Sequence, residues 1–280
     1  MLDENNVNHV YLNHCILIKL VGVEWMLHQF SRNELAFGKA GLERLQKSTV
    51  AILGIGGVGS FAAEALARSG VGRLILVDKD VIDITNVNRQ IHALLSTVGE
   101  PKVEMMKQRI QDINPECEII THKMFYTEET FEKFFEIPLD YVIDASDTIS
   151  YKIHLIKECR RRGIPLVSSM GAANKMDPTR FKVADISKTT HDPIAKVIRT
   201  KLRKEGIHKG VTVVFSDESP IVIREDIRKE IVPDENTKIR KAKMPPSSNA
   251  FVPSVAGLIA ASHAVRELIK DIEIKRVGKE

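Results

Sequence analysis

Cysteine is scarce in this chain of 280 residues. Only Cys15, Cys117 and Cys159 occur, too few and too scattered for a disulfide framework. No Cys-x-x-Cys pair is present, which excludes a structural zinc site built in that way. We therefore expect reduced thiols and a cytoplasmic protein. The composition, 43% hydrophobic and 28% charged, also excludes a collagen-like, low-complexity or wholly disordered chain.

Long apolar runs are lacking as well. The nearest approach, residues 15–27, is interrupted by Lys19 and Glu24, so the sequence predicts no transmembrane helix, no signal peptide and no membrane partner. We expect Met26 to be the natural start and residues 1–25 to be a non-native or disordered extension. Residues 26–280 would then form a single domain, in which residues 217–248, charged and rich in proline, are a surface crossover loop.

Charge is nearly balanced overall and uneven along the chain. The formal net charge is +4, whereas residues 151–210 hold 15 basic and 5 acidic residues. Their local charge of +10 leaves −6 for the remainder. Such a basic block suggests a polyanionic partner, although a solvated helix face has the same composition.

Strands and helices alternate along most of the sequence. The first unit is an apolar run at 48–54, a glycine-rich turn, a helix at 60–69 and a second strand at 73–78. The pattern then predicts helices at 101–113, 128–135, 151–162, 193–204 and 254–270, and strands at 118–122, 141–144, 165–169, 181–185 and 211–216, with at most a short strand at 220–223. This order predicts an α/β fold, a Rossmann-like, doubly wound and mainly parallel sheet with a C-terminal crossover region and a final helix.

The turn after the first strand has glycines spaced Gly-x-Gly-x-x-Gly, at Gly54, Gly56 and Gly59. Glycines permit a tight turn and a close backbone approach, and the helix that follows offers free N–H groups to a phosphate. Asp78 ends the next strand, where a carboxylate accepts hydrogen bonds from ribose hydroxyls. The pattern predicts a nucleotide site and by itself favours NAD over ATP; a ligand-free turn is the alternative.

The segment after Asp78 changes that balance. It places amide and cationic side chains shortly after Asp78 in the sequence, whereas nicotinamide chemistry needs an apolar slot beside the ring. Cations offset the phosphate charge as pyrophosphate leaves, so this set favours nucleotidyl transfer. Turn formation by the two asparagines and a surface position for Arg89 remain alternatives. The residues are Asp80, Thr85, Asn86, Asn88, Arg89, Gln90 and Lys102.

Two carboxylates, Asp144 and Asp147, follow the buried strand at 141–144. Ligands of an open α/β sheet bind at the carboxyl ends of the strands, so a magnesium ligand is expected here. A helix N-cap is the competing interpretation for Asp144. For Asp147 we favour metal or nucleotide contact.

Taken together, these motifs resemble the ThiF/MoeB/HesA family, adenylating enzymes related to the ubiquitin-activating enzymes. The resemblance rests on the glycine-rich turn, Asp78-x-Asp80, residues 86–90, Lys102 and Asp144-x-x-Asp147, and spans roughly residues 29–268. Within the family the chain is most similar to the tRNA threonylcarbamoyladenosine dehydratases, through segments at 88–94, 113–117, 159–167, 177–179 and 185–193.

The resemblance implies an ATP-dependent enzyme that adenylates the carboxylate of threonylcarbamoyladenosine in tRNA and promotes its cyclisation. Arg32, Arg89, Lys102 and Asp147 would be catalytic. Arg32 would reach into the nucleotide site of a partner subunit, which implies a homodimer. Asp147 would also hold Mg²⁺. ATP would be bound by Gly54, Gly56, Gly57, Gly59, Asp78, Asp80, Thr85, Asn86, Asn88, Arg89, Gln90, Lys102 and Asp147.

The basic block is the candidate tRNA surface. Its cations are Arg160, Arg161, Arg162, Lys196, Arg199, Lys201, Arg203 and Lys204. Residues 171–250 lack the thioester-forming cysteine of relatives that transfer a ubiquitin-like protein, so a nucleophilic cysteine is disfavoured. Three alternatives stay open: adenylation of a ubiquitin-like sulfur-carrier protein, an NAD-dependent oxidoreductase, and a non-catalytic scaffold. A sulfur-relay or carrier protein is also a possible partner.

Overall fold

A computed structural model describes residues 8–12, 15–20, 23–231 and 246–277. Its centre is a seven-stranded sheet in the order β6-β5-β4-β7-β8-β10-β9. All neighbouring strands run parallel except β9, which is antiparallel to β10. The strands are β4 (Thr49–Leu53), β5 (Arg73–Val77), β6 (Glu118–His122), β7 (Tyr141–Asp144), β8 (Leu166–Ser169), β9 (Phe181–Asp185) and β10 (Thr212–Ser216).

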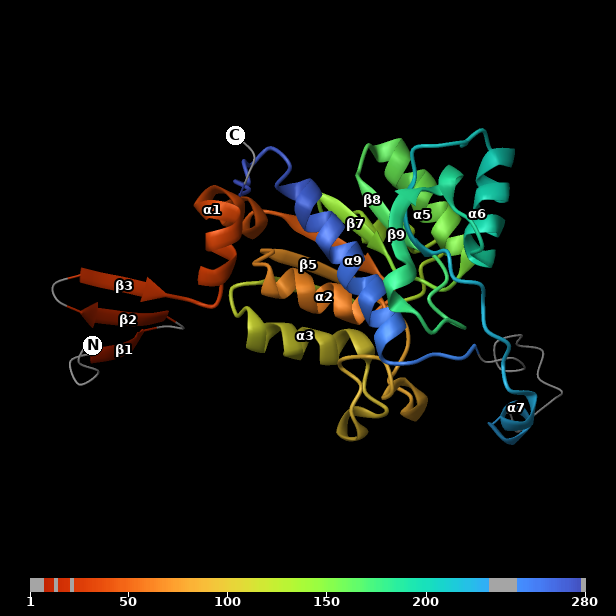
Figure 1. Ribbon diagram of the computed structural model, residues 1–280, viewed down its shortest axis with the longest axis horizontal. Helices are drawn as coiled ribbons and strands as arrows, with labels where there is room; N and C mark the ends of the chain where they lie inside the picture. Colours follow the sequence, from red (N-terminus) through yellow and green to blue (C-terminus); the bar gives the residue numbers. More distant parts are fainter. Residues whose placement is uncertain (1–7, 13–14, 21–22, 232–245, 278–280) are drawn as a thin grey trace.

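Helices cover both faces of this sheet (Figure 1), which is why every residue of β4 is buried and its sequence is apolar almost throughout. On one face lie α2 (Gly59–Arg68), α3 (Lys102–Ile113) and α9 (Phe251–Leu268), which share one core with the sheet. On the other lie α4 (Phe131–Phe134), α5 (Ile149–Arg162) and α6 (Pro193–Lys204). The predicted doubly wound fold is confirmed.

Local sequence explains where α5 and α6 begin and end. Asp192 caps α6 by accepting hydrogen bonds from the backbone N–H groups of Ile194 and Ala195, at 2.9 and 3.0 Å. Helix α5 ends at Gly163, which has the left-handed conformation (φ 69°) that favours glycine. Among the described residues, the connections include 3₁₀ turns at Ile84–Asn86, Leu95–Thr97, Pro178–Arg180 and Ile186–Lys188.

Several elements differ from the prediction, and α1 (Ser31–Gln46) is a helix that the sequence did not predict. Helix α4 is four residues long, because the chain before Phe131 forms turns. Residues 220–223 form no strand, and the crossover instead carries α7 (Glu225–Ile231), which the sequence did not predict. The rest of the predicted crossover, 232–245, lies outside the described residues.

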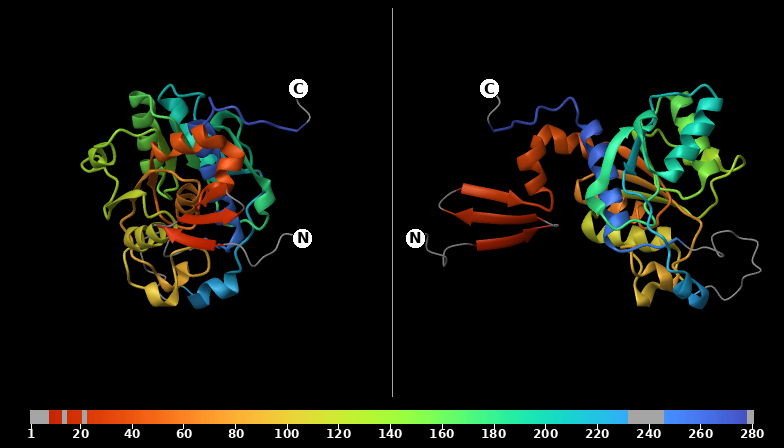
Figure 2. Two further views of the ribbon diagram at one scale, coloured as in Figure 1. Left: turned by 90° about the vertical axis from the view of Figure 1, so that its left-hand side faces the viewer. Right: turned by 45° about the vertical axis from the view of Figure 1, so that its right-hand side comes forward.

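The N-terminal segment forms strands rather than an unstructured extension. Strands β1 (Asn8–Leu12), β2 (Cys15–Leu20) and β3 (Val23–Leu27) pair as a separate antiparallel sheet. Figure 2 shows this sheet beside α1 (Ser31–Gln46), apart from the central sheet. That residues 1–25 are not native to the protein stays a prediction. No helix in the described ranges has the length and apolar character needed to cross a membrane.

Candidate active site

The strand order reverses between β4 and β7, and polar groups gather at the carboxyl ends of these strands. The glycine-rich turn follows β4. Gly54 has a φ of 90° and its N–H donates to Val77 O (2.8 Å). A Cβ on Gly54 would lie 2.8 Å from Ala145 O, and a Cβ on Gly59 only 1.8 Å from Gly54 O. Both positions therefore require glycine, because backbone atoms stand where a side chain would begin.

Helix α2 begins at this turn, and the N–H of its second residue, Ser60, donates to Gly56 O (3.0 Å). Its N-cap residue, Val58, makes no side-chain cap hydrogen bond, and no acidic residue occupies the first turn. Gly56 lies near the Gln90 amide, and Gly57 lies beneath Pro253 of α9. The helix terminus therefore presents N–H donors and a positive dipole end, as a phosphate site requires.

Asp78, the residue that follows β5, contacts the glycine-rich turn. Its carboxylate accepts hydrogen bonds from the backbone N–H groups of Ile55 (2.7 Å) and Asp80 (2.9 Å). Burial raises its pKa, while the nearby Lys102 ammonium opposes that rise. The sequence placed Asp78 at a ribose position, and the structure brings it against the glycine-rich turn.

Lys102 and Asp80 form an ion pair beside Asp78. The Nζ of Lys102 lies 3.1 Å from Asp80 Oδ2, and its side chain is 8% exposed whereas that of Asp80 is 45% exposed. Lys79 pairs with the other oxygen of Asp80 at 2.6 Å. Burial opposes ionisation of Asp80, but its hydrogen bonds to Lys79 and the charge of Lys102 outweigh that and lower its pKa. One side of this pair is therefore open to solvent and to a ligand.

The loop after β5 carries the amides and the guanidinium. Arg89 Nη1 donates to Thr85 O (2.6 Å) and to Asn88 Oδ1 (2.8 Å), which holds the guanidinium in place. Asn86 is buried and accepts a hydrogen bond from Asp83 N, so it also forms the turn that the sequence allowed as its alternative. Burial lowers the pKa of Arg89.

Two buried side chains of this loop have polar atoms without partners among the described residues. They are Gln90 Oε1 and both ring nitrogens of His92. Burial, together with the charges of Lys102 and Arg109, lowers the pKa of His92 to about 4, so the ring is neutral at pH 7. His92 was not among the predicted site residues, because nothing in the sequence shows that its ring is enclosed.

The two carboxylates after β7 have different surroundings. Asp144 is fully buried and pairs with Lys152 Nζ at 3.1 Å. Its oxygens are taken by protein donors, and the N-cap of α5 is Thr148. Asp144 is thus neither a helix cap nor available to a metal ion, which corrects both interpretations offered for it. Asp147 is exposed at the same edge of the sheet.

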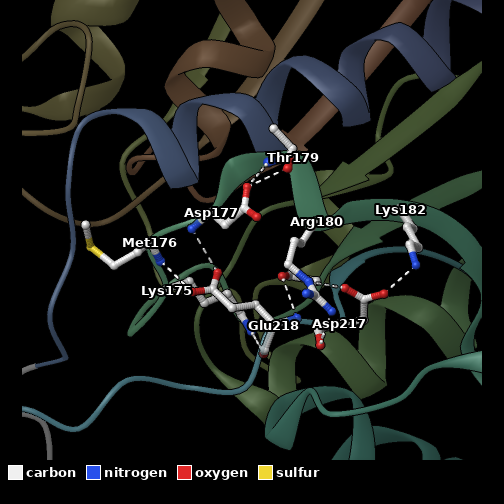
Figure 3. A network of polar contacts seen from close by, with 9 residues as sticks. Lys175, Met176, Asp177, Thr179, Arg180, Lys182, Asp217 and Glu218 are labelled. Atoms are coloured by element: carbon white, nitrogen blue, oxygen red, sulfur yellow. Dashed lines mark hydrogen bonds and ion pairs between the residues drawn. The ribbon is translucent and has the colours of Figure 1, made fainter.

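A further loop, residues 170–177, borders the site beyond β8 and was missed by the sequence analysis. Its backbone N–H groups at Met176 and Asp177 donate to the Glu218 carboxylate at 2.8 and 3.0 Å, and buried Lys175 donates to Glu218 O at 2.8 Å (Figure 3). Arg180 and Lys182 pair with Asp217 beside it. The loop is thereby fixed to the chain that leaves β10.

Asn174 joins both ends of the crossover to this loop. It has a left-handed φ of 57°, and its backbone O accepts from Ile221 N at 2.8 Å. Its side-chain Oδ1 accepts from Ser247 N at 2.8 Å. Asn88 Nδ2 donates to the neighbouring Ser248 O at 3.0 Å. The end of the crossover therefore lies between the loop after β8 and the loop that carries Arg89.

Arg32 does not join the other predicted residues. It is exposed at the start of α1, and the adjacent Asn33 donates to Arg68 O at 2.7 Å. Arg68 is the last residue of α2, whose first residue lies at the glycine-rich turn. Ten helical residues span about 15 Å, so Arg32 lies about that far from the nucleotide residues of its own chain.

The predicted tRNA cations divide into two groups. Arg161 and Arg162 are engaged by Glu158 and Glu132, while Arg160 donates to Gly210 O and Arg199 to Thr189 O. The remaining cations lie exposed on α6 and form no ion pair with any residue that the structure describes: Lys196, Lys201, Arg203 and Lys204.

Neither Cys117 nor Cys159 has the surroundings of a nucleophile. Cys117 and Cys159 are buried. Burial raises the pKa of Cys117 to about 12 and also raises that of Cys159. A thiol nucleophile needs the opposite shift. The arrangement of the site instead suits a nucleotide, whose phosphates would meet the N-terminus of α2, Arg89 and Lys102, and whose ribose would meet Asp78.

The model of the ThiF family matches residues 30–279. The chain belongs to the ThiF family. This ThiF-family chain is 79% identical over 252 residues to the tRNA threonylcarbamoyladenosine dehydratase of Bacillus subtilis, covering 90% of this chain and 99% of that protein.

Solved structures of an E. coli relative agree with this assignment to the ThiF family. The structure of the E. coli tRNA N6-threonylcarbamoyladenosine dehydratase TcdA in complex with ATP has a TM-score of 0.76 and 36% identity, covering 87% of this chain and 94% of that one. Its complex with AMP has a TM-score of 0.77. The resemblance inferred from the motifs is confirmed.

Proposed function

We propose that this chain is an ATP-dependent tRNA threonylcarbamoyladenosine dehydratase. The observation that carries the proposal is the 79% identity to the B. subtilis dehydratase over nearly all of that protein. The site agrees with it, because a glycine-rich turn, a buried lysine and a held arginine converge at one edge of the sheet. Of the alternatives, an NAD-dependent oxidoreductase would need an apolar slot where Lys102 and Arg89 stand.

The reaction has two steps. The carboxylate of the threonylcarbamoyl group attacks the α-phosphate of ATP, the bond to pyrophosphate breaks, and an acyl adenylate forms. A nucleophile within the same side chain then attacks the activated carbonyl, closes a ring and expels AMP. One carboxylate oxygen leaves with AMP and the attacking nucleophile releases its proton, so the net change in the tRNA, counted from the carboxylic acid, is loss of water. Neither step needs an enzyme nucleophile, in keeping with the buried cysteines.

The protein supplies position and positive charge. The N–H groups at the start of α2 would hold the phosphates, and Arg89 and Lys102 would balance the charge that grows as pyrophosphate leaves. When the phosphates arrive, Lys102 can exchange its exposed partner Asp80 for them. Asp78, with its carboxylate fixed by two backbone N–H groups, would accept hydrogen bonds from the ribose.

Mg²⁺ fits this site in the way that nucleotide enzymes use it. Mg²⁺ is commonly held by one or two carboxylates together with the phosphates of the substrate. Within the described ranges, no three His, Cys, Asp or Glu side chains gather as a metal site. Asp147, an exposed carboxylate at the carboxyl edge of the sheet, would hold the ion, which would supply further neutralisation of phosphate charge.

A homodimer would complete the site. Because Asn33 contacts Arg68 at the far end of α2, Arg32 lies roughly one helix length, about 15 Å, from the glycine-rich turn of its own chain, and could therefore serve the nucleotide site of a partner subunit. The exposed cations of α6 are the main candidate for contact with tRNA phosphates, with Arg160, Arg161 and Arg162 contributing less because carboxylates or carbonyls already engage them. A tRNA substrate agrees with the predicted cytoplasmic location.

ATP–pyrophosphate exchange tests the proposal. The purified protein is given threonylcarbamoyl-modified tRNA, unmodified tRNA or a sulfur-carrier protein, and we expect exchange only with modified tRNA. Exchange supported by the carrier protein alone would overturn the substrate. Tight NAD binding without exchange under any condition would overturn adenylation altogether.

Subunit mixing tests the dimer. The variants Arg32→Ala and Lys102→Ala should each be inactive and should recover up to about a quarter of the activity when mixed at equal concentration, since half of the exchanged dimers carry one intact composite site. Subunit exchange is checked by light scattering or a size-tagged partner. No recovery after verified exchange would contradict a role for Arg32 in the partner's site.

A further inference from the structure

A buried ionic cluster lies directly behind the candidate nucleotide site. Asp144, the last residue of β7, is 0% exposed, and Lys152, in the first turn of α5, is 2% exposed. Asp144 Oδ2 accepts from Lys152 Nζ (3.1 Å) and from Ser168 Oγ of β8 (2.6 Å). One carboxylate oxygen thus joins two neighbouring strands and a helix.

The other oxygen of Asp144 shapes the turn that leads to Asp147. Oδ1 accepts from the backbone N–H of Ser146 (3.1 Å) and from its hydroxyl (2.7 Å). This turn packs against the glycine-rich turn, because Ala145 N donates to Leu53 O (2.8 Å) and Ala145 O occupies the space that a Cβ on Gly54 would need. The turn from Asp144 to Asp147 and the glycine-rich turn therefore hold each other in place.

Asp147 stands between two positions that this cluster holds. Ser146 is held from one side by Asp144. Thr148 is held from the other, because Lys152 N donates to Thr148 O (3.1 Å) while the Lys152 side chain is anchored on Asp144. The backbone on either side of Asp147 is thus tied to the same buried pair.

Stability alone does not explain a buried ion pair, since desolvation offsets much of its attraction and apolar residues of similar volume often stabilise a fold as well. Geometry does explain it. A carboxylate accepts at four positions, and these four are used by a turn, a strand and a helix that must meet at one point.

We propose that Asp144, oriented by Lys152, is a positioning residue that sets Asp147 in the geometry for Mg²⁺-ATP. The inference rests on the proposed function, in which Asp147 holds the ion. It assigns no contact with substrate to Asp144 or Lys152.

Two double variants test the inference by differing at one side chain. D144L/K152M removes the buried charges and leaves Ser146 N without its acceptor. D144N/K152M also removes the charges but keeps an amide oxygen for Ser146. ATP binding is measured by calorimetry with Mg²⁺ and with EDTA, alongside thermal unfolding of each variant.

We expect D144L/K152M to fold and to lose roughly tenfold in ATP affinity with Mg²⁺, as is usual when groups that orient metal ligands are removed. Its affinity in EDTA should stay within about threefold of the native value, and D144N/K152M should restore Mg²⁺-dependent binding to within about threefold. Equal binding by both double variants, whether native or weakened, would overturn the inference.

A single change covers the case in which D144L/K152M fails to fold. Ser146→Ala leaves the buried pair intact and removes one of the two hydrogen bonds to Oδ1. It should weaken Mg²⁺-dependent binding about threefold, and unchanged binding would count against the proposal.

Asp147→Asn separates the two proposals. If this variant binds Mg²⁺-ATP normally, the proposed metal site is wrong. If it loses that binding while both double variants keep it, only the role of Asp144 is wrong.

Discussion

Lys102 and Lys152 each sit in the first turn of a helix at the carboxyl edge of the sheet, and each has an aspartate oxygen at 3.1 Å. The pairs differ in what surrounds the carboxylate. Asp80 is 45% exposed and shared with Lys79, whereas Asp144 is fully enclosed with hydroxyl and backbone donors. A cation with an exposed partner can change partners when phosphates arrive. A cation with an enclosed partner cannot, and serves the fold.

The sharpest test of this difference is the effect of Lys102 on adenylation. Lys102→Met should reduce ATP–pyrophosphate exchange by about 10³-fold, since one preorganised charge at a reacting phosphate contributes on that scale. The free energy of unfolding should change by less than about 1 kcal/mol, because Asp80 is partly exposed and keeps its ion pair with Lys79. Exchange assays and urea unfolding measure the two effects, and a loss of activity that followed unfolding would contradict the prediction.

Replacing Lys152 should affect the free energy of unfolding strongly, in contrast to replacing Lys102. Lys152→Met leaves the Asp144 carboxylate buried without its cation, which should lower the free energy of unfolding by about 3 kcal/mol. Urea unfolding at pH 7 measures this loss. Replacing Asp144 as well, in D144N/K152M, should recover most of it. A single variant as stable as the native protein would mean that the pair is not enclosed as described.

The same distinction applies to the basic block. The double variant K201A/K204A, which removes exposed and unpaired cations, should lower tRNA affinity roughly tenfold at low salt and reduce the slope of log affinity against log salt by about 1.5. Arg161→Ala, which removes a cation paired with Glu158, should cost about twofold or less. Filter binding across a salt series measures both, with Lys270→Ala, which follows the C-terminal end of α9, as a control outside α6. An effect of Arg161→Ala equal to half or more of that of K201A/K204A, on the logarithmic scale, would contradict the distinction.

The smallest expected effect is a pH dependence. Burial raises the pKa of Asp78, so its carboxylate takes up a proton as pH falls through that raised value, and a protonated group is a poorer acceptor for the ribose. Adenosine, which has no phosphates to titrate, should bind progressively more weakly as the pH is lowered from 7 into the acid range. Lys102→Met should move this loss to higher pH, because the lysine opposes the rise. Adenosine binding by Asp78→Asn should be weak and independent of pH.

Much of the fold could be predicted because its signals are local. Apolar runs, glycine turns and Asp192 before Pro193 marked most strands and helices to within a residue or two. Helix α7 escaped because it lies among charges and prolines in a segment without apolar periodicity. The short α4 was overestimated because aromatic residues at 131, 134 and 135 serve a turn as well as a helix.

The site could be predicted as far as motifs reach. The glycine-rich turn, Asp78, Lys102 and Arg89 converge as expected. What separates Asp144 from Asp147 is contact with Lys152 and Ser168, and Glu218 reaches Met176 across 42 residues of sequence. Such contacts follow from the strand order of the sheet, which a single sequence expresses only weakly.

Asn174 has a consequence for how this region can change in evolution. Because Ile221 and Ser247 are fastened to the same residue, the chain between them begins and ends at one point. Lengthening a closed loop costs little, since the entropy of closure grows only with the logarithm of its length. Insertions, deletions and whole grafted modules can therefore accumulate between these two anchors while the nucleotide site beneath keeps its dimensions.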